Sequence, residues 1–132
     1  MRVFFFILFS LSAHAQIEGR WLTEDKTGTI EIFKEKDRFF GKIVGGTPRG
    51  DGFDRKNPDE KLRSREVMNL VIMRDLKKID ETHFADGKIY DPDSGNTYSC
   101  KLTLESPTKL TLRGFLGISL FGRSETWTRV VP

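Results

Sequence analysis

Two arginines in the middle of the chain have the spacing of an anion-binding pair. Arg63 and Arg65 are two residues apart, so in an extended segment their side chains would point the same way. A guanidinium group binds a carboxylate or a phosphate through two parallel hydrogen bonds. The alternative is that the two arginines pair with Asp54, Asp59 or Glu60 of the same polar segment, and we favour this pairing.

Oxygen-bearing side chains in the same segment raise the question of a calcium site. Asp51, Asp54, Asn57 and Asp59 are close in sequence, and Ca²⁺ takes several oxygen ligands from a flexible loop. Their spacing lacks the EF-hand pattern, and basic residues at positions 49, 55 and 56 crowd the segment. We therefore expect Asn57-Pro58-Asp59 to start a turn and cap a short helix rather than to bind a metal.

The other reactive residue types form no catalytic constellation. Beyond residue 15 the sequence has one histidine, His83, and no G-x-S-x-G motif, which argues against a Ser-His-acid triad and a His-pair metal site. Asp91 and Asp93 belong to a predicted tight turn, and no two acids are placed to flank a cleft. Cys100, the single cysteine, is interpreted as a buried hydrophobe. We predict no enzyme, metal or cofactor.

The first fifteen residues have the pattern of a secretory signal peptide. Met1-Arg2 is a short positive start, residues 3–11 are apolar, and residues 12–15 end in small side chains. We predict cleavage between Ala15 and Gln16, which makes the protein exported, either periplasmic or secreted. The apolar run is too short for a transmembrane segment, which takes about 20 residues.

Composition and charge predict one globular domain over residues 16–132. The full chain has 132 residues, 37% hydrophobic and 31% charged, with a formal net charge of +3. Basic residues alternate with acidic ones, as in Lys34-Glu35-Lys36-Asp37-Arg38, whereas nucleic-acid binding needs a clustered basic face. We therefore predict no nucleic-acid partner.

Period-two alternation of apolar residues predicts an all-β fold. It is clearest where Tyr98, Cys100, Leu102 and Leu104 share one side of a strand. The predicted strands cover residues 17–23, 30–34, 39–44, 68–76, 82–90, 98–105, 110–113 and 124–130. A polar loop covers residues 45–63, and a short helical turn covers residues 58–65 with Asn57 as its N-cap. About eight strands at this spacing predict a single antiparallel up-and-down barrel.

Both ends of the domain carry residues that would close such a barrel. Gly19 and Trp21 lie on the first predicted strand, and Trp127 and Arg129 lie on the last. Neighbouring first and last strands would place Arg129 over the face of Trp21, a stack that could contribute about 1–2 kcal/mol. This arrangement resembles the lipocalin-like, or calycin, signature.

A series of blocks along the chain resembles a bacterial exported family, domain of unknown function 2147. They include Gly19-Arg20-Trp21-Leu22-Thr23, Asn57-Pro58-Asp59, Gly87-Lys88-Ile89-Tyr90-Asp91-Pro92 and Trp127-Thr128-Arg129-Val130. The resemblance implies a secreted or periplasmic lipocalin-like barrel with an undefined ligand. Family members often carry two cysteines near the second and third strands, and this sequence has none there.

Two functions from different classes follow. The first is a binding module for a small, largely apolar or amphipathic ligand, whose acid group Arg63 or Arg65 would meet. Its proposed contacts also include Phe39, Tyr98, Leu102 and Leu112, within an inner lining of Ile30, Ile32, Phe39, Leu70, Ile72, Tyr98, Leu102, Leu104, Leu110 and Leu112. The second is a packed barrel that docks on an envelope protein through its charged loops or residues 115–121. Interior volume discriminates between them.

Overall fold

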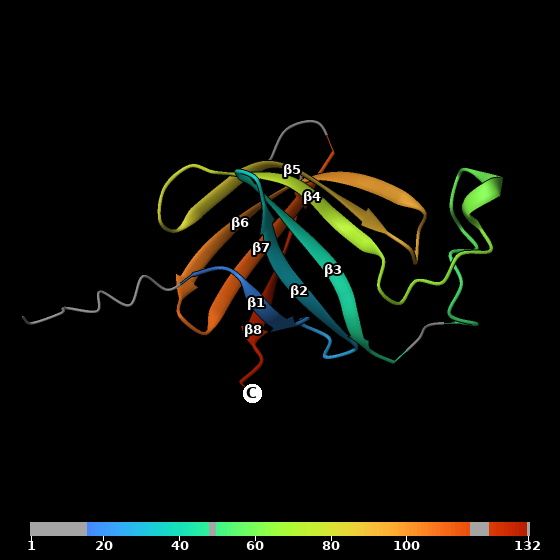
Figure 1. The fold of residues 1–132 in the computed structure, drawn as a ribbon, viewed down its shortest axis with the longest axis horizontal. Coiled ribbons are helices and arrows are strands. Elements are labelled where there is room, and N and C mark those ends of the chain that lie inside the picture. The colour runs from blue at the N-terminus through green and yellow to red at the C-terminus, as the bar shows by residue number, and fades with distance from the viewer. Residues whose placement is uncertain (1–15, 48–49, 117–121, 132) are drawn as a thin grey trace, which may run out of the picture.

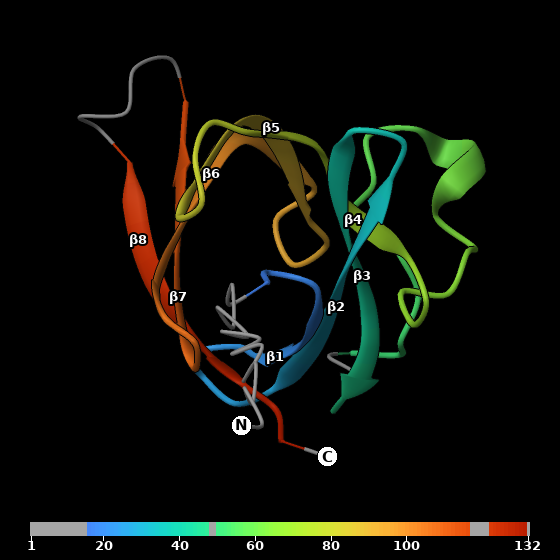
Figure 2. The ribbon, with the colours of Figure 1, turned by 60° about the vertical axis from the view of Figure 1, so that its left-hand side comes forward.

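The computed structural model describes residues 16–47, 50–116 and 122–131. Within them, eight antiparallel strands follow one another in sequence order around a closed barrel, and the last strand pairs with the first (Figures 1 and 2). This confirms the predicted all-β, up-and-down barrel. The strands are β1 (Gly19–Leu22), β2 (Gly28–Glu35), β3 (Arg38–Gly46), β4 (Val71–Lys78), β5 (His83–Asp91), β6 (Asn96–Ser106), β7 (Lys109–Phe115) and β8 (Arg123–Arg129).

Some predictions fall on residues outside the described ones. They concern the signal peptide of residues 1–15 with its cleavage site, and most of the segment 115–121, of which the structure describes Phe115 and the exposed Leu116. These stay predictions.

The described residues contain no helix long and apolar enough to cross a membrane.

The up-and-down order gives the two ends of the barrel different connections. One end, here called the terminal end, carries residues 16–18, the three turns after β2, β4 and β6, and the chain after β8. The other, here called the loop end, carries the connections after β1, β3, β5 and β7. The longest of these, residues 47–70, lies between β3 and β4 and extends to one side of the barrel (Figures 1 and 2).

The predicted inner lining is largely buried. Ile30, Ile32, Phe39, Ile72, Leu102, Leu104, Leu110 and Leu112 are buried, and Leu70 and Tyr98 are partly buried. Alternation is interrupted in β4, where Met73 and Leu76 are both fully buried, because Asp75 adopts a left-handed φ of 63°. Gly41 and Gly87 leave room for these two side chains: a Cβ there would lie 2.8 Å from Met73 Cε and 2.6 Å from Leu76 Cγ.

Arg129 joins the two ends of the chain at the seam between β1 and β8. The seam has two residue pairs, Trp21 with Arg129 and Leu22 with Thr128. The Arg129 guanidinium lies 4.3 Å from the centre of a Trp21 ring, and it donates to the carbonyl oxygens of Glu18 (2.9 Å) and Gln16. We call this group of contacts the clasp.

The clasp also involves residues around the seam. Arg129 Nε donates to the Pro107 carbonyl oxygen at 2.7 Å, and Trp21 Nε1 donates to that of Ile17 at 2.9 Å. Gly19 has a φ of 132°, and a Cβ at this position would lie 2.8 Å from Arg129 Nη1. A glycine is therefore required at position 19 both by the backbone conformation and by the close approach of the arginine.

The predicted helical turn is shorter than expected and begins later. The structure has a 3₁₀ helix over Glu60–Leu62, whose N-cap is Asp59 rather than Asn57. The prediction of a helix over residues 58–65 capped by Asn57 is therefore wrong. The helix begins after Asp59, because Asp59 has an extended backbone (φ −86°, ψ 111°) and its side chain accepts from the Lys61 amide. Asn57 instead accepts from the Asp59 amide and donates to the Asp54 carboxylate.

We expect Arg129→Ala to lower the free energy of unfolding by about 2–3 kcal/mol, because it removes a cation–π contact and charged hydrogen bonds to three carbonyl groups. Chemical denaturation of the variant and of Arg20→Ala measures this. Arg20 is the matched control, since its side chain is 59% exposed and its ion pair with Glu31 spans 3.8 Å; its loss should cost less than about 0.5 kcal/mol. Equal destabilisation by the two variants would show that the clasp does not hold the seam.

Candidate functional site

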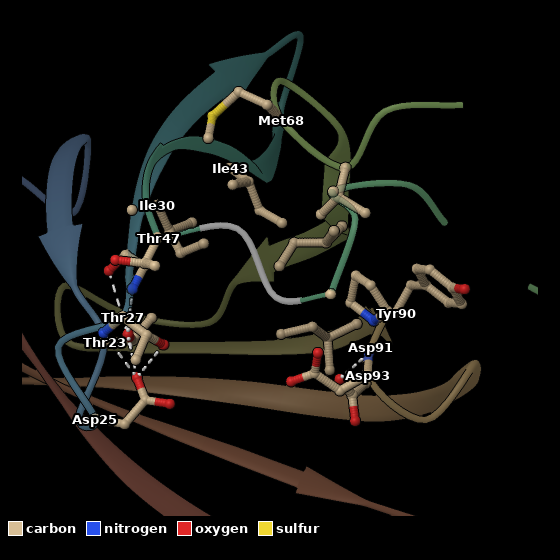
Figure 3. Close-up of a pocket in the computed structure, with 18 of the residues that line it drawn as sticks. Thr23, Asp25, Thr27, Ile30, Ile43, Thr47, Met68, Tyr90, Asp91 and Asp93 are labelled. Carbon is tan, nitrogen blue, oxygen red and sulfur yellow. Dashed lines mark hydrogen bonds between the residues drawn. The ribbon is translucent and has the colours of Figure 1, made fainter. Parts of the chain in front are cut away.

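An open cavity of about 1200 Å³ occupies the loop end of the barrel. Its wall comes from β2 to β8, and its rim comes from the connections after β1, β3 and β5. Figure 3 shows side chains that line it. The opposite end is narrowed by the clasp and the buried ring of Trp21. The barrel is therefore open at the loop end and narrowed at the terminal end.

The wall of the cavity is largely apolar because the strands alternate. Inward positions supply branched aliphatic side chains and two aromatic rings. These residues are Ile30, Ile43, Ile72, Ile89, Leu112, Tyr98 and Trp127. Gly114, also on the wall, leaves space: a Cβ there would meet its nearest neighbour, Tyr98 Cβ, at 3.9 Å.

The rim is polar, and its turns are held by their own side chains. Asp25 accepts from the Thr23 hydroxyl at 2.8 Å and from the Thr27 hydroxyl at 2.7 Å, which fixes the turn after β1 (Figure 3). Asp91 accepts from the Asp93 amide at 3.0 Å, which fixes the turn after β5. The interaction of Asp91 is the structural role predicted for this residue in the Asp91–Asn96 turn.

A buried carboxylate anchors the long loop to the barrel. Asp54 is fully buried and accepts from Tyr90 Oη of β5 at 2.5 Å, from Asn57 Nδ2 at 2.8 Å and from Arg65 Nε at 2.9 Å. Its backbone amide donates to the Arg65 carbonyl at 2.9 Å. The loop segment that carries part of the rim is thus held on the wall by one charged group with three side-chain donors.

Electrostatics favour the ionised form of Asp54. Burial raises the pKa of this carboxyl, but hydrogen bonds from Tyr90, Asn57 and Arg65 outweigh burial and lower the pKa below its ordinary value. Burial and the adjacent carboxylate raise the pKa of Tyr90 to about 12. Tyr90 therefore remains a donor and Asp54 remains an acceptor through the neutral pH range.

A family model described as an uncharacterized protein conserved in bacteria, DUF2147, matches residues 19–129. This chain belongs to the DUF2147 family. The match begins at Gly19 in β1 and ends at Arg129 in β8, so it spans the whole barrel from one side of the clasp to the other. The family predicted from the sequence is confirmed.

The solved structure of a bacterial protein has the same fold. The DUF2147 chain is similar to protein HP1028 from the human pathogen Helicobacter pylori, described as a member of the lipocalin family, with 24% identity and a TM-score of 0.81 over 88% of this chain and 84% of that chain. A redesigned β-barrel is similar at 18% identity and a TM-score of 0.49, over 91% of this chain and 96% of that chain. The comparison with curated proteins found no match. The fold of the DUF2147 chain is thus a lipocalin-like barrel.

The residues predicted from the sequence to contact a ligand lie in different parts of the DUF2147 barrel. Tyr98 and Leu112 line the cavity. Phe39 instead lines a pocket of about 300 Å³ at the terminal end, and Leu102 is buried in the core outside the lining of either pocket.

The predicted anion-binding arginines do not line the cavity either. Arg65 pairs with Asp54, and Arg63 donates to the Asn57 carbonyl at 2.7 Å and lies 3.8 Å from Glu60. The expectation that they point the same way assumed an extended segment, whereas Arg63 ends the 3₁₀ helix with φ −69° and ψ −16°. The favoured alternative, pairing with acids of the same loop, is what the structure has.

Sequence reasoning missed two charged residues on the cavity wall. Arg123 and Glu125 line the cavity from β8 together with Trp127. The signal was present in the sequence, because counting back from Trp127 by twos places Glu125 and Arg123 on the same side of the strand.

The other reactive side chains considered from the sequence, His83 and Cys100, lie in different surroundings. His83 is exposed, with Nδ1 2.9 Å from Asp80 Oδ1 in the turn after β4. Cys100 is buried, and burial raises the pKa of its thiol to about 12. Among the described residues, no group of three or more His, Cys, Asp or Glu is placed to hold a metal ion.

We expect Asp54→Asn to loosen the long loop, because the amide cannot replace a carboxylate that accepts from three donors. The amide hydrogen of Val67 donates to Gly52 across the loop at 3.0 Å and reports on this opening. Its hydrogen exchange should accelerate by about fivefold or more, corresponding to about 1–3 kcal/mol. Asp59→Asn, at the exposed N-cap nearby, should change it by less than about threefold.

Hydrogen exchange at the Val67 amide should also depend on pH. A lowered folded pKa means that the contribution of Asp54 is present above the ordinary pKa of an aspartate and is lost as pH falls through the folded pKa. We expect exchange at Val67, corrected for its intrinsic pH dependence, to accelerate below about pH 4 in the natural sequence. Asp54→Asn should abolish that response, and an unchanged response would assign it to another group.

Proposed function

We propose that this DUF2147 barrel binds a small, largely apolar ligand in its cavity. The observation that carries the proposal is the open cavity of about 1200 Å³, with an aliphatic and aromatic wall below a polar rim. Ligand sites typically have about 300–1000 Å³ and combine an apolar lining with a few polar groups. An eight-stranded barrel is wide enough for one small ligand.

The interior volume also discriminates between the two functions considered from the sequence, a binding module and a packed barrel. A barrel packed with side chains would have to act through its outer surface, whereas this cavity exposes apolar wall to solvent. Burying such a wall against a ligand releases about 25 cal/mol for each Å² of apolar surface. The cavity therefore supports the binding module over the envelope-docking alternative. We place this binding in an exported protein, on the basis of the signal-peptide pattern of residues 1–15.

The proposal is tested by filling the cavity at Gly114. We expect Gly114→Leu to weaken binding of 1-octanol, measured by calorimetry, at least tenfold, because the new side chain occupies the wall next to Tyr98. The space around this Cβ position predicts that folding is preserved, with the free energy of unfolding changed by less than about 1 kcal/mol.

Thr111→Leu is the matched control. It introduces the same side chain on the same strand at a position outside the cavity lining, and it should leave octanol affinity within about twofold. The proposal fails if the natural sequence does not bind octanol, or if Gly114→Leu and Thr111→Leu have the same effect on the affinity.

A further inference from the structure

The inner face of β8 changes character along its length. From the terminal end towards the loop end, Trp127, Glu125 and Arg123 occupy successive inward positions and line the cavity. Cross-strand partners fix their depth: Glu125 pairs with Leu112, and Arg123 pairs with Gly114 one step closer to the rim. Glu125 is partly buried and Arg123 is exposed. Glu125 thus lies between the apolar wall and the rim.

The Glu125 carboxylate is held in one orientation and can still accept further hydrogen bonds. It accepts from Trp127 Nε1 at 2.5 Å, which fixes the carboxylate beside the indole ring. A carboxylate offers about four lone-pair positions, so one hydrogen bond leaves room for a further donor from within the cavity.

Acidic side chains outnumber basic ones in the lining of the cavity. Of the described lining residues, Asp25, Asp51, Glu66, Asp91, Asp93 and Glu125 are acidic, whereas Arg55, Lys56 and Arg123 are basic. Arg55 and Asp51 form an ion pair at 2.8 Å, and Arg55 also lies over the Phe53 ring. Without this pair, five acidic and two basic residues remain in the described lining. Figure 3 shows Asp25 on one side of the cavity and Asp91 and Asp93 on the other. A cleft lined mainly by one sign of charge focuses its potential on the ligand.

We propose that the ligand of this cavity is a cationic amphiphile, with an ammonium group received by the Glu125 carboxylate and an apolar body against the aliphatic wall. The inference rests on the proposed function and adds the charge of the ligand to it. It replaces the expectation of an acidic ligand met by Arg63 or Arg65, which the structure places outside the cavity lining.

Three probes with the same eight-carbon chain test the inference: octylammonium, 1-octanol and octanoate. We expect calorimetry at neutral pH and low salt to give octylammonium the highest affinity, about tenfold above octanoate, because an attraction of 1.4 kcal/mol is a factor of ten. Glu125→Gln keeps an acceptor for Trp127 Nε1 and removes the charge. It should reduce octylammonium affinity to near that of octanol and leave octanol within about twofold.

Two further variants separate the site from general surface charge. Glu105→Gln removes the same charge from an exposed position that accepts from Thr111 outside the lining, and it should leave all three affinities unchanged. Arg123→Gln should strengthen octylammonium binding.

The outcomes distinguish this inference from the proposed function. Octanol binding without discrimination between the two charged probes overturns the cationic ligand and leaves the apolar binding module standing. The inference is equally overturned if octanoate binds best, or if Glu125→Gln leaves octylammonium affinity unchanged. If none of the three probes binds the natural sequence, the proposed function and the inference fail together.

Discussion

The arrangement of this barrel depends on one arginine at the last position of β8. The first strand has four residues, and it meets the last through two residue pairs, so backbone pairing across the seam is short. Arg129 adds a stack on Trp21 and hydrogen bonds to carbonyl groups before β1 and after β6. Because a guanidinium presents five donors in a rigid plane, it can bind several backbone segments at once.

Closure at the terminal end leaves the loop end as the opening of the cavity. The clasp, the ring of Trp21 and the buried Ile17 occupy that end, so solvent reaches the apolar wall from the loop end. There the buried Asp54 holds the long loop against Tyr90 of β5, and the same loop contributes rim residues such as Asp51 and Phe53. The part of the rim that the long loop contributes is therefore held by a buried charge.

Much of this fold could be predicted from the sequence because its signals are local. Tyr98, Cys100, Leu102 and Leu104 alternate along one strand, and Gly19, Trp21 and Arg129 occupy the two ends that meet at the seam. The interruption in β4 could not be predicted, since it depends on the left-handed conformation of Asp75 and on space left by Gly41 and Gly87.

The cavity was harder to predict than the barrel. Whether side chains fill an eight-stranded barrel depends on their packing across strands, and no single-strand pattern reports it. The polar loop gave a wrong prediction for a different reason. The spacing of Arg63 and Arg65 suggested an anion site, but the turn at Arg63 and the buried Asp54 make both side chains interact within the loop. The charged groups that do face the cavity, Glu125 and Arg123, follow from the alternation of β8.

The isoleucine methyl groups offer the most direct test of a ligand in the cavity. Ile30, Ile43, Ile72 and Ile89 line it, whereas Ile17 lies at the terminal end and Ile79 is exposed after β4. Titration of the isotope-labelled protein with octylammonium should shift the four cavity methyl resonances in one saturable transition and leave those of Ile17 and Ile79 in place. Shifts confined to Ile17 or Ile79, or no shift at any cavity methyl at millimolar probe, would contradict binding inside the barrel.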